Sequence, residues 1–154
     1  EIRYIEGAQH TFLDGEDVSD EIRKPDVSML ASAVSAHPCV REKMVEMQRK
    51  IAKSTDCVLD GRDIGSFVLP DAKYKFFVTA DPKIRAERRF AELTAKGEKV
   101  EFDTVYKEIV ERDYNDSHRT FSPLVCAKDA VLLDTSSMTP EEVVDFVIGK
   151  IEER

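Results

Sequence analysis

An apolar run that ends in a charged turn, residues 57–65, is the feature that most constrains the fold of this chain. Its sequence is Cys-Val-Leu-Asp-Gly-Arg-Asp-Ile-Gly. Apolar residues followed by an Asp-Gly pair are typical of a buried strand that ends in a turn, so we predict a strand over 57–60. Ligands of open α/β sheets bind in the crevice beyond the carboxyl ends of the strands. Arg62 and Asp63 are therefore candidate ligand-binding residues, although a turn with two solvated charges fits the local pattern equally well.

Strand and helix patterns alternate along the rest of the chain. Apolar residues at helical spacing predict helices from Pro25, from Pro38, over about 82–95, from about 103 to 119 and after Thr139. Runs rich in β-branched and aromatic residues predict strands over 74–78 and 131–134, and a hairpin or meander within 1–18. This alternation predicts an α/β fold with a parallel sheet. A seam near residues 54–56 separates residues 1–55 from residues 56–154.

Local signals mark where two of these helices begin. Asp81 precedes Pro82, which is the pattern of an N-cap acid followed by proline at the first helical position. Thr139 and Glu142 have the spacing of a capping box. The helix from Pro38 carries one apolar stripe that we expect to face inward, formed by Val40, Met44, Met47 and Ile51.

Composition and charge exclude several classes of function. The 154 residues are 42% hydrophobic and 35% charged, which is enough for one core with an attached lobe. A net charge of −8 argues against nucleic-acid or membrane-surface binding, so a site for an anion must be built locally from a few convergent arginines. Three scattered cysteines without a C-x-x-C pair suggest reduced thiols in the cytoplasm rather than disulfides or a metal site. No apolar run approaches the ~20 residues that cross a bilayer.

Short motifs follow one another along most of the chain. They are Leu-Asp-Gly-Glu-Asp-Val-Ser at 13–19, Leu-Asp-Gly-Arg-Asp-Ile-Gly at 59–65, Pro-Asp-Ala at 70–72, Glu-Arg-Asp at 111–113 and Ser-Pro-Leu at 122–124. In this order and spacing they resemble the bacterial cytidylate kinases, which are nucleoside monophosphate kinases. The resemblance implies a P-loop NTPase-like parallel sheet flanked by helices. It also implies a small nucleoside-monophosphate-binding lobe of short strands and two helices over 1–55, and an α/β core over 56–154 with a lid helix at about 82–102.

The resemblance further implies roles for individual residues. A carboxylate is a natural acceptor for the exocyclic amine of cytosine, and arginine binds carbonyl and phosphate oxygens bidentately. Contacts to the base fall to Ser32, Arg41 and Asp63, contacts to the sugar to Arg112 and Asp116, and contacts to the phosphate to Arg62 and Arg119. Arginines that close over the transferring phosphates correspond to Arg85, Arg88 and Arg89. On this resemblance Arg62, Arg119, Arg88 and Arg89 are the catalytic set.

The spacing of three of these residues supports the assignment independently. Steps of four and three residues place Arg112, Asp116 and Arg119 on one face of the predicted helix, across which a sugar and a phosphate could lie. From the residues alone, the alternative is a solvated helix end with ion pairs worth about 0.3–0.5 kcal/mol each.

One motif of the family is not found among the 154 residues. None of the six glycines fits the phosphate-binding loop G-x-x-x-x-G-K-[ST], whose backbone amides hold ATP. The chain begins at Glu1 in what looks like a cut, so we expect the loop and its central strand to precede it. The resemblance then implies CMP or dCMP and ATP with Mg²⁺ as substrates, no metal site in the chain itself, and no nucleic-acid or membrane partner.

A chain without that strand has further expected properties. The strands matching 57–60 and 74–78 would lack partners on their inner edges, and unpaired strand edges recruit other chains. We therefore expect the 154 residues alone to be inactive, and to aggregate, swap domains or pair with the missing segment.

Two other functions fit parts of the sequence. A magnesium-dependent hydrolase could use Asp60 and Asp63, but it leaves the arginine-rich helix unexplained. A non-catalytic nucleotide-binding module becomes attractive if the chain is complete. Codons upstream of Glu1 separate the kinase from the binding module, because only the kinase requires a strand and a phosphate-binding loop there.

Overall fold

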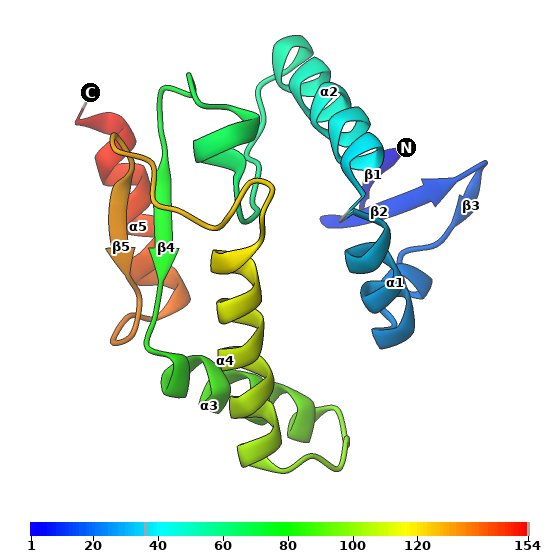
Figure 1. Cartoon of the computed structure of the whole chain (residues 1–154), viewed down its shortest axis with the longest axis vertical. Coiled ribbons are helices and arrows are strands. Elements are labelled where there is room, and N and C mark those ends of the chain that lie inside the picture. The colour runs from blue at the N-terminus through cyan, green and yellow to red at the C-terminus, as the bar shows by residue number, and fades with distance from the viewer. Residues whose placement is uncertain (36, 154) are drawn as a thin grey trace. The chain divides into compact units, whose positions relative to one another are not determined.

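The computed structural model describes residues 1–35 and 37–153, apart from the side chains of Pro25, Asp26, Ser28, Met29 and Ser32. The chain forms two compact units, Glu1–Ile51 and Ala52–Arg154, and each is described by itself (Figure 1). Helices and two small sheets make it an α/β protein. The functional division into a binding lobe over 1–55 and a core over 56–154 stays a prediction.

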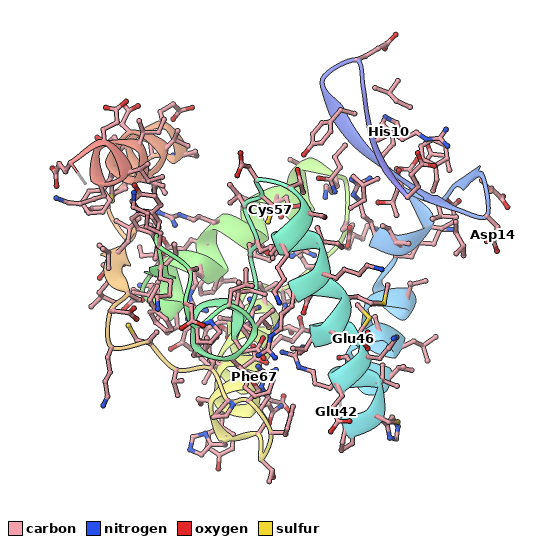
Figure 2. All side chains as sticks on the ribbon, turned by 90° about the horizontal axis from the view of Figure 1, so that it is seen from above. His10, Asp14, Glu42, Glu46, Cys57 and Phe67 are labelled. Atoms are coloured by element: carbon pink, nitrogen blue, oxygen red, sulfur yellow. The ribbon has the colours of Figure 1, made fainter. Side chains whose placement is uncertain are left out.

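The N-terminal unit begins with an antiparallel meander, as predicted. Strands β1 (Ile2–Ile5), β2 (Ala8–Leu13) and β3 (Glu16–Asp17) pair in chain order. The two turns are Glu6-Gly7 and Asp14-Gly15, and all four residues have positive φ, which is the requirement of two-residue hairpin turns. Asp14 stands at the outer end of the second turn, and His10 lies on β2 (Figure 2).

Two helices complete this unit after a short 3-10 turn over Glu21–Arg23. They are α1 (Pro25–Ser35) and α2 (Pro38–Ser54), and both begin at the prolines predicted from the sequence. The predicted inward face of α2 is wrong for three of its four residues, and only Val40 is half-buried. Met44, Met47 and Ile51 are 43–49% exposed, whereas Val45 is buried at 5%.

The buried stripe of α2 lies one position around the helix from the predicted one. Its members, at positions 41, 45, 48 and 52, follow the i, i+4, i+7 pattern and are buried or half-buried. Long polar side chains such as those of Arg41 and Gln48 can cover apolar surface with their stems, so hydrophobicity alone does not identify the packed face. Glu42 and Glu46 lie one turn apart on the exposed side (Figure 2).

The predicted strand over 57–60 is not formed. These residues are irregular, and Val58 is 98% exposed. A strand exists only when a neighbour exchanges hydrogen bonds with it, and no strand of the described ranges pairs with this segment. The turn leads instead into a single π-helical turn, Ile64–Val68, whose last residue is 1% exposed.

The C-terminal unit contains a two-stranded parallel sheet. Strand β4 (Phe76–Thr79) pairs with β5 (Val131–Asp134), Phe76 opposite Val131. The parallel direction and the position of β5 confirm the prediction, while β4 begins two residues later than the predicted start at Tyr74. After β5, helix α5 (Pro140–Glu152) starts with the predicted capping box of Thr139 and Glu142.

The connection between the two strands is a packed helical hairpin. Helix α3 (Pro82–Ala95) begins at Asp81, whose side chain accepts a hydrogen bond from the amide of Lys83. Helix α4 (Phe102–His118) returns towards the sheet. A cluster of apolar side chains holds the two helices together, made of Ala86, Phe90, Leu93, Val100, Phe102, Val105 and Ile109. The hairpin is therefore a small core of its own, which carries the arginines of both helices.

The capping box of α5 provides a test of this local reasoning. The Thr139 hydroxyl accepts from the Glu142 amide at 3.3 Å, and the Glu142 carboxylate accepts from the Thr139 amide at 2.8 Å. We expect Thr139→Ala to lower the free energy of unfolding by about 1 kcal/mol, measured by urea denaturation. Thr94→Ala is the matched control, because that hydroxyl only donates to the Phe90 carbonyl within α3. An equal loss in both variants would contradict the capping role.

Candidate functional site

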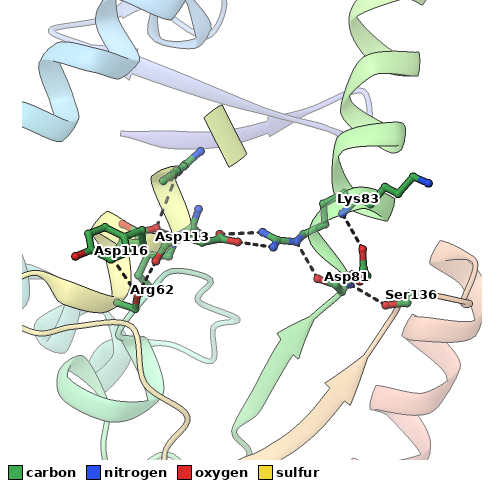
Figure 3. Close-up of polar contacts among 11 residues, drawn as sticks. Arg62, Asp81, Lys83, Asp113, Asp116 and Ser136 are labelled. Carbon is green, nitrogen blue, oxygen red and sulfur yellow. Dashed lines mark hydrogen bonds and ion pairs between the residues drawn. The ribbon is translucent and has the colours of Figure 1, made fainter. Parts of the chain in front are cut away.

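Two arginines meet at one carboxylate on helix α4. Arg62, just after the Asp60-Gly61 turn, donates from Nε to Oδ2 of Asp116 at 2.6 Å. Arg112, one helical turn before Asp116, places Nε 4.0 Å from the same oxygen. The Asp116 side chain is 20% exposed, whereas those of Arg62 and Arg112 are 43% and 71% exposed. Both arginine side chains are thus more exposed than the carboxylate that they share, and Figure 3 shows Arg62 directed at Asp116.

A second carboxylate of α4 holds a third arginine. Asp113 accepts two hydrogen bonds from the guanidinium of Arg85 on α3, at 2.9 and 2.5 Å. The remaining donor of Arg85, Nε, binds the Ala80 carbonyl at 3.0 Å, just after β4. The pKa of Asp113 lies below its ordinary value of 3.8, and the main cause is the hydrogen bond from Arg85. Burial raises this pKa, whereas the positive charges of Arg62 and Arg112 lower it further. Arg85 thus joins three elements: β4, α3 and α4.

Asp63 and Arg119 form the next part of the site. Asp63 is 4% exposed, and its Oδ2 accepts a hydrogen bond from the Ser122 hydroxyl at 2.5 Å. Arg119 places Nη2 4.0 Å from the same oxygen and donates from Nε to the Ser122 carbonyl. The prediction that Arg119 shares a helix face with Arg112 and Asp116 is wrong, because α4 ends at His118 and Arg119 is extended (φ −64°, ψ 141°). It reaches Asp63 because the chain turns after the helix.

The two further arginines of α3 have partners of their own. Arg88 donates to the carbonyl oxygens of Thr135 and Met138 at 2.6 and 3.3 Å, in the connection between β5 and α5. Arg89 pairs with Glu92 one turn along its own helix, at 2.8 Å. In the described arrangement Arg88 stabilises the connection that follows β5, and Arg89 takes part in an exposed helical ion pair. Their predicted role over transferring phosphates stays a prediction.

The predicted contacts to the base divide between the two units. Arg41 is half-buried in α2, and Ser32 belongs to α1, but its side chain lies outside the described residues. Asp63 belongs to the other unit. The roles of all three residues in binding a base stay predictions.

Two polar contacts of the site were not anticipated from the sequence. In the sequence, Asp113 belongs to the Glu-Arg-Asp motif and Ser122 to Ser-Pro-Leu, and neither motif predicts these contacts. The alternation of Arg112 with Asp113 and Asp116 could have indicated that two faces of α4 bind arginines, because residues one apart point in different directions. No local signal marks Ser122, whose partners are 59 and 3 residues away.

The arrangement favours binding of an anion. Arg62, Arg85 and Arg112 surround Asp113 and Asp116, so three positive charges meet two negative ones in a protein of net charge −8. In the described ranges, no group of three or more His, Cys, Asp or Glu side chains is arranged to hold a metal ion. No described helix has both the length and the apolar character that crossing a membrane requires.

Comparisons with known proteins agree with the motifs of the chain. A family model described as cytidylate kinase matches residues 1–153. A cytidylate kinase of Caldanaerobacter subterraneus is 52% identical over 143 residues, covering 93% of this chain and 64% of that protein. One of Enterococcus faecalis is 49% identical, covering 97% and 66%, and one of Halalkalibacterium halodurans is 44% identical, covering 100% and 70%. The chain thus spans about two thirds of the length of the relatives it matches.

The pair of Arg85 and Asp113 links stability to pH. Because the native pKa of Asp113 lies below 3.8, its ion pair stabilises the folded state above that pH, and the stabilisation is lost as the pH falls through the native pKa. We expect Asp113→Asn to lower the free energy of unfolding by about 1 kcal/mol at pH 7, after allowance for solvent screening. Below pH 3.8 the variant and the wild type should converge, as followed by urea denaturation across a pH series.

Glu92→Gln is the matched control, because Glu92 also pairs with an arginine but its side chain is more exposed, at 48% against 36% for Asp113. Glu92→Gln should lower the free energy of unfolding by less than Asp113→Asn does. A loss for Asp113→Asn that stays constant from pH 7 to pH 2 would show that the ionised pair is not its cause.

Proposed function

Because the chain belongs to the cytidylate kinase family, we propose that the protein transfers a phosphoryl group from ATP, bound with Mg²⁺, to CMP or dCMP. An oxygen of the monophosphate attacks the γ-phosphorus of ATP, the bond to the β–γ bridging oxygen breaks, and CDP or dCDP and ADP are formed. The observation that carries the proposal is the meeting of Arg62 and Arg112, fifty residues apart, at Asp116. That arrangement suits a ligand with a dianionic phosphate beside a hydroxylated sugar.

Each part of the nucleotide has a proposed partner. Arg62 and Arg119 bind the phosphate, and Arg112 with Asp116 binds the sugar and its surroundings. Asp63, Arg41 and Ser32 recognise cytosine, with the Asp63 carboxylate accepting from the exocyclic amine. Asp63 is buried at 4% exposure, so binding of the base requires displacement of atoms that now cover the carboxylate.

Arg88 and Arg89 are proposed to act during transfer. Phosphoryl transfer depends on stabilising the charge spread over the phosphoryl oxygens, which guanidinium groups do well. Arg88 would have to exchange the carbonyl groups of Thr135 and Met138 for phosphate oxygens, and Arg89 would have to leave Glu92. Helix α3 (Pro82–Ala95) lies within the lid proposed over about 82–102, which would close over the transferring phosphates.

Base recognition provides a first test of the proposal. We expect Asp63→Asn to weaken CMP binding about tenfold, because the amide retains an acceptor for Ser122 but offers a poorer partner to the cytosine amine. Binding of UMP, which lacks that amine, should change by less than about twofold. Calorimetric titration of the protein as its gene encodes it measures both. Equal losses for CMP and UMP would remove Asp63 from base recognition.

The phosphate-binding motif provides a second test. The 154 residues contain no G-x-x-x-x-G-K-[ST], so we propose that a polypeptide of only these residues does not transfer phosphate from ATP. A coupled assay of ADP release with CMP should show no turnover above the rate without enzyme. Addition of a family segment that carries the loop should restore turnover. Robust turnover by the 154 residues alone would mean that other residues build the ATP site.

A further inference from the structure

Ser122 occupies a strained position between two residues of the proposed site. Its φ is +53°, in the left-handed region that favours glycine, although the proline that follows it favours extended conformations. Non-glycine residues remain in such conformations only when the surroundings over-determine them. The strain therefore points to contacts that hold Ser122 in place.

Four contacts hold this turn. The Ser122 hydroxyl donates to the buried carboxylate of Asp63, and the Ser122 carbonyl accepts from Nε of Arg119, each at 2.5 Å. The amide of Leu124 donates to the carbonyl of Asp116 at 2.8 Å, which ties the turn to the last part of α4. The ring of Phe121 packs edge-on against that of Phe67, with centroids 5.3 Å apart, which ties the turn to the π-helical segment after Asp63.

The left-handed conformation of Ser122 directs its carbonyl to Arg119 and its hydroxyl to Asp63 at the same time. The guanidinium then lies 4.0 Å from the carboxylate, beyond hydrogen-bond distance, and its Nη2 is buried without a hydrogen-bond partner among the described atoms. A buried donor without an acceptor lowers the stability of the fold unless a ligand oxygen accepts a hydrogen bond from it.

We propose that Ser122 is a positioning residue of the nucleotide site, which keeps Arg119 apart from Asp63 so that Nη2 of Arg119 remains available to a phosphate oxygen of the bound monophosphate. This inference rests on the proposed function for the identity of the ligand. Without the Ser122 hydroxyl, Oδ2 of Asp63 would accept from Nη2 of Arg119 instead. The guanidinium would then leave the Ser122 carbonyl as the two charged groups close into a direct pair.

Ser122→Gly is the decisive variant. Glycine adopts the left-handed conformation without strain, so the change removes the hydroxyl and adds no steric strain to the backbone. Relief of that strain and the direct pair of Arg119 with Asp63 offset the lost hydroxyl bond, so the midpoint of thermal unfolding should not fall. A merely structural serine, whose loss leaves the buried carboxylate unpaired, would lower it. Ser136→Gly is the matched control, because the Ser136 hydroxyl also lies 2.5 Å from an aspartate, Asp134, away from Asp63 and Arg119.

The first measurement needs no ligand. Hydrogen exchange of the Arg119 Nε–H, followed by NMR, reports its bond to the Ser122 carbonyl. We expect Ser122→Gly to accelerate this exchange about tenfold, Ser136→Gly to leave it unchanged, and Ser122→Asn to restore it. Asparagine tolerates positive φ and carries a side-chain donor for Asp63. An exchange rate in Ser122→Gly within about twofold of the wild type would overturn the inference, whatever the ligand.

The second measurement connects Ser122 to the nucleotide. We expect Ser122→Gly to weaken CMP binding about tenfold and cytidine binding by less than about twofold, because the donor that is lost serves the phosphate. Equal effects on CMP and cytidine, or no effect on CMP, would overturn the positioning role. If the wild type binds no CMP, the proposed function fails, and the exchange rate still decides whether Ser122 positions Arg119.

Discussion

Two carboxylates on helix α4 hold the guanidinium groups around which the C-terminal unit is arranged. Asp113 binds Arg85 and Asp116 binds Arg62, so α4 is tied both to the end of β4 and to the turn after residue 60. Charge-assisted bonds of this kind are stronger than neutral ones and specify direction. Because three arginines share two carboxylates, the cluster keeps a local excess of positive charge within an acidic protein.

Features that depend on neighbouring residues were the ones that the sequence predicted well. The cap at Asp81, the capping box at Thr139 and the Asp14-Gly15 turn are each complete within four residues, so no distant partner decides them. The helix positions followed in the same way from apolar periodicity. The site residues could be proposed because the motifs that carry them are contiguous, and Arg62 with Asp116 then came together in space.

Features that depend on distant partners were missed. The segment 57–60 has the composition of a buried strand, but strand formation requires hydrogen bonds from another strand, which no local pattern guarantees. The apolar stripe of α2 was placed one position away from the buried one, because packing decides which side is covered. Arg119 was placed on the helix, although α4 ends one residue earlier. The position of Ser122 between Asp63 and Arg119 also arises only from the folded turn.

The contacts of Arg88 have a consequence for how readily α3 could move. An arginine that already donates to two carbonyl groups reaches a new anion by exchanging acceptors rather than by gaining them. The net enthalpy of such an exchange is small, since similar bonds are broken and made. The connection from Thr135 to Met138 would in turn lose the side chain that organises it, and α5 begins directly after that connection. Motion at the N-terminal half of α3 would thus remove side-chain contacts from the connection that leads into a helix some fifty residues further along the chain.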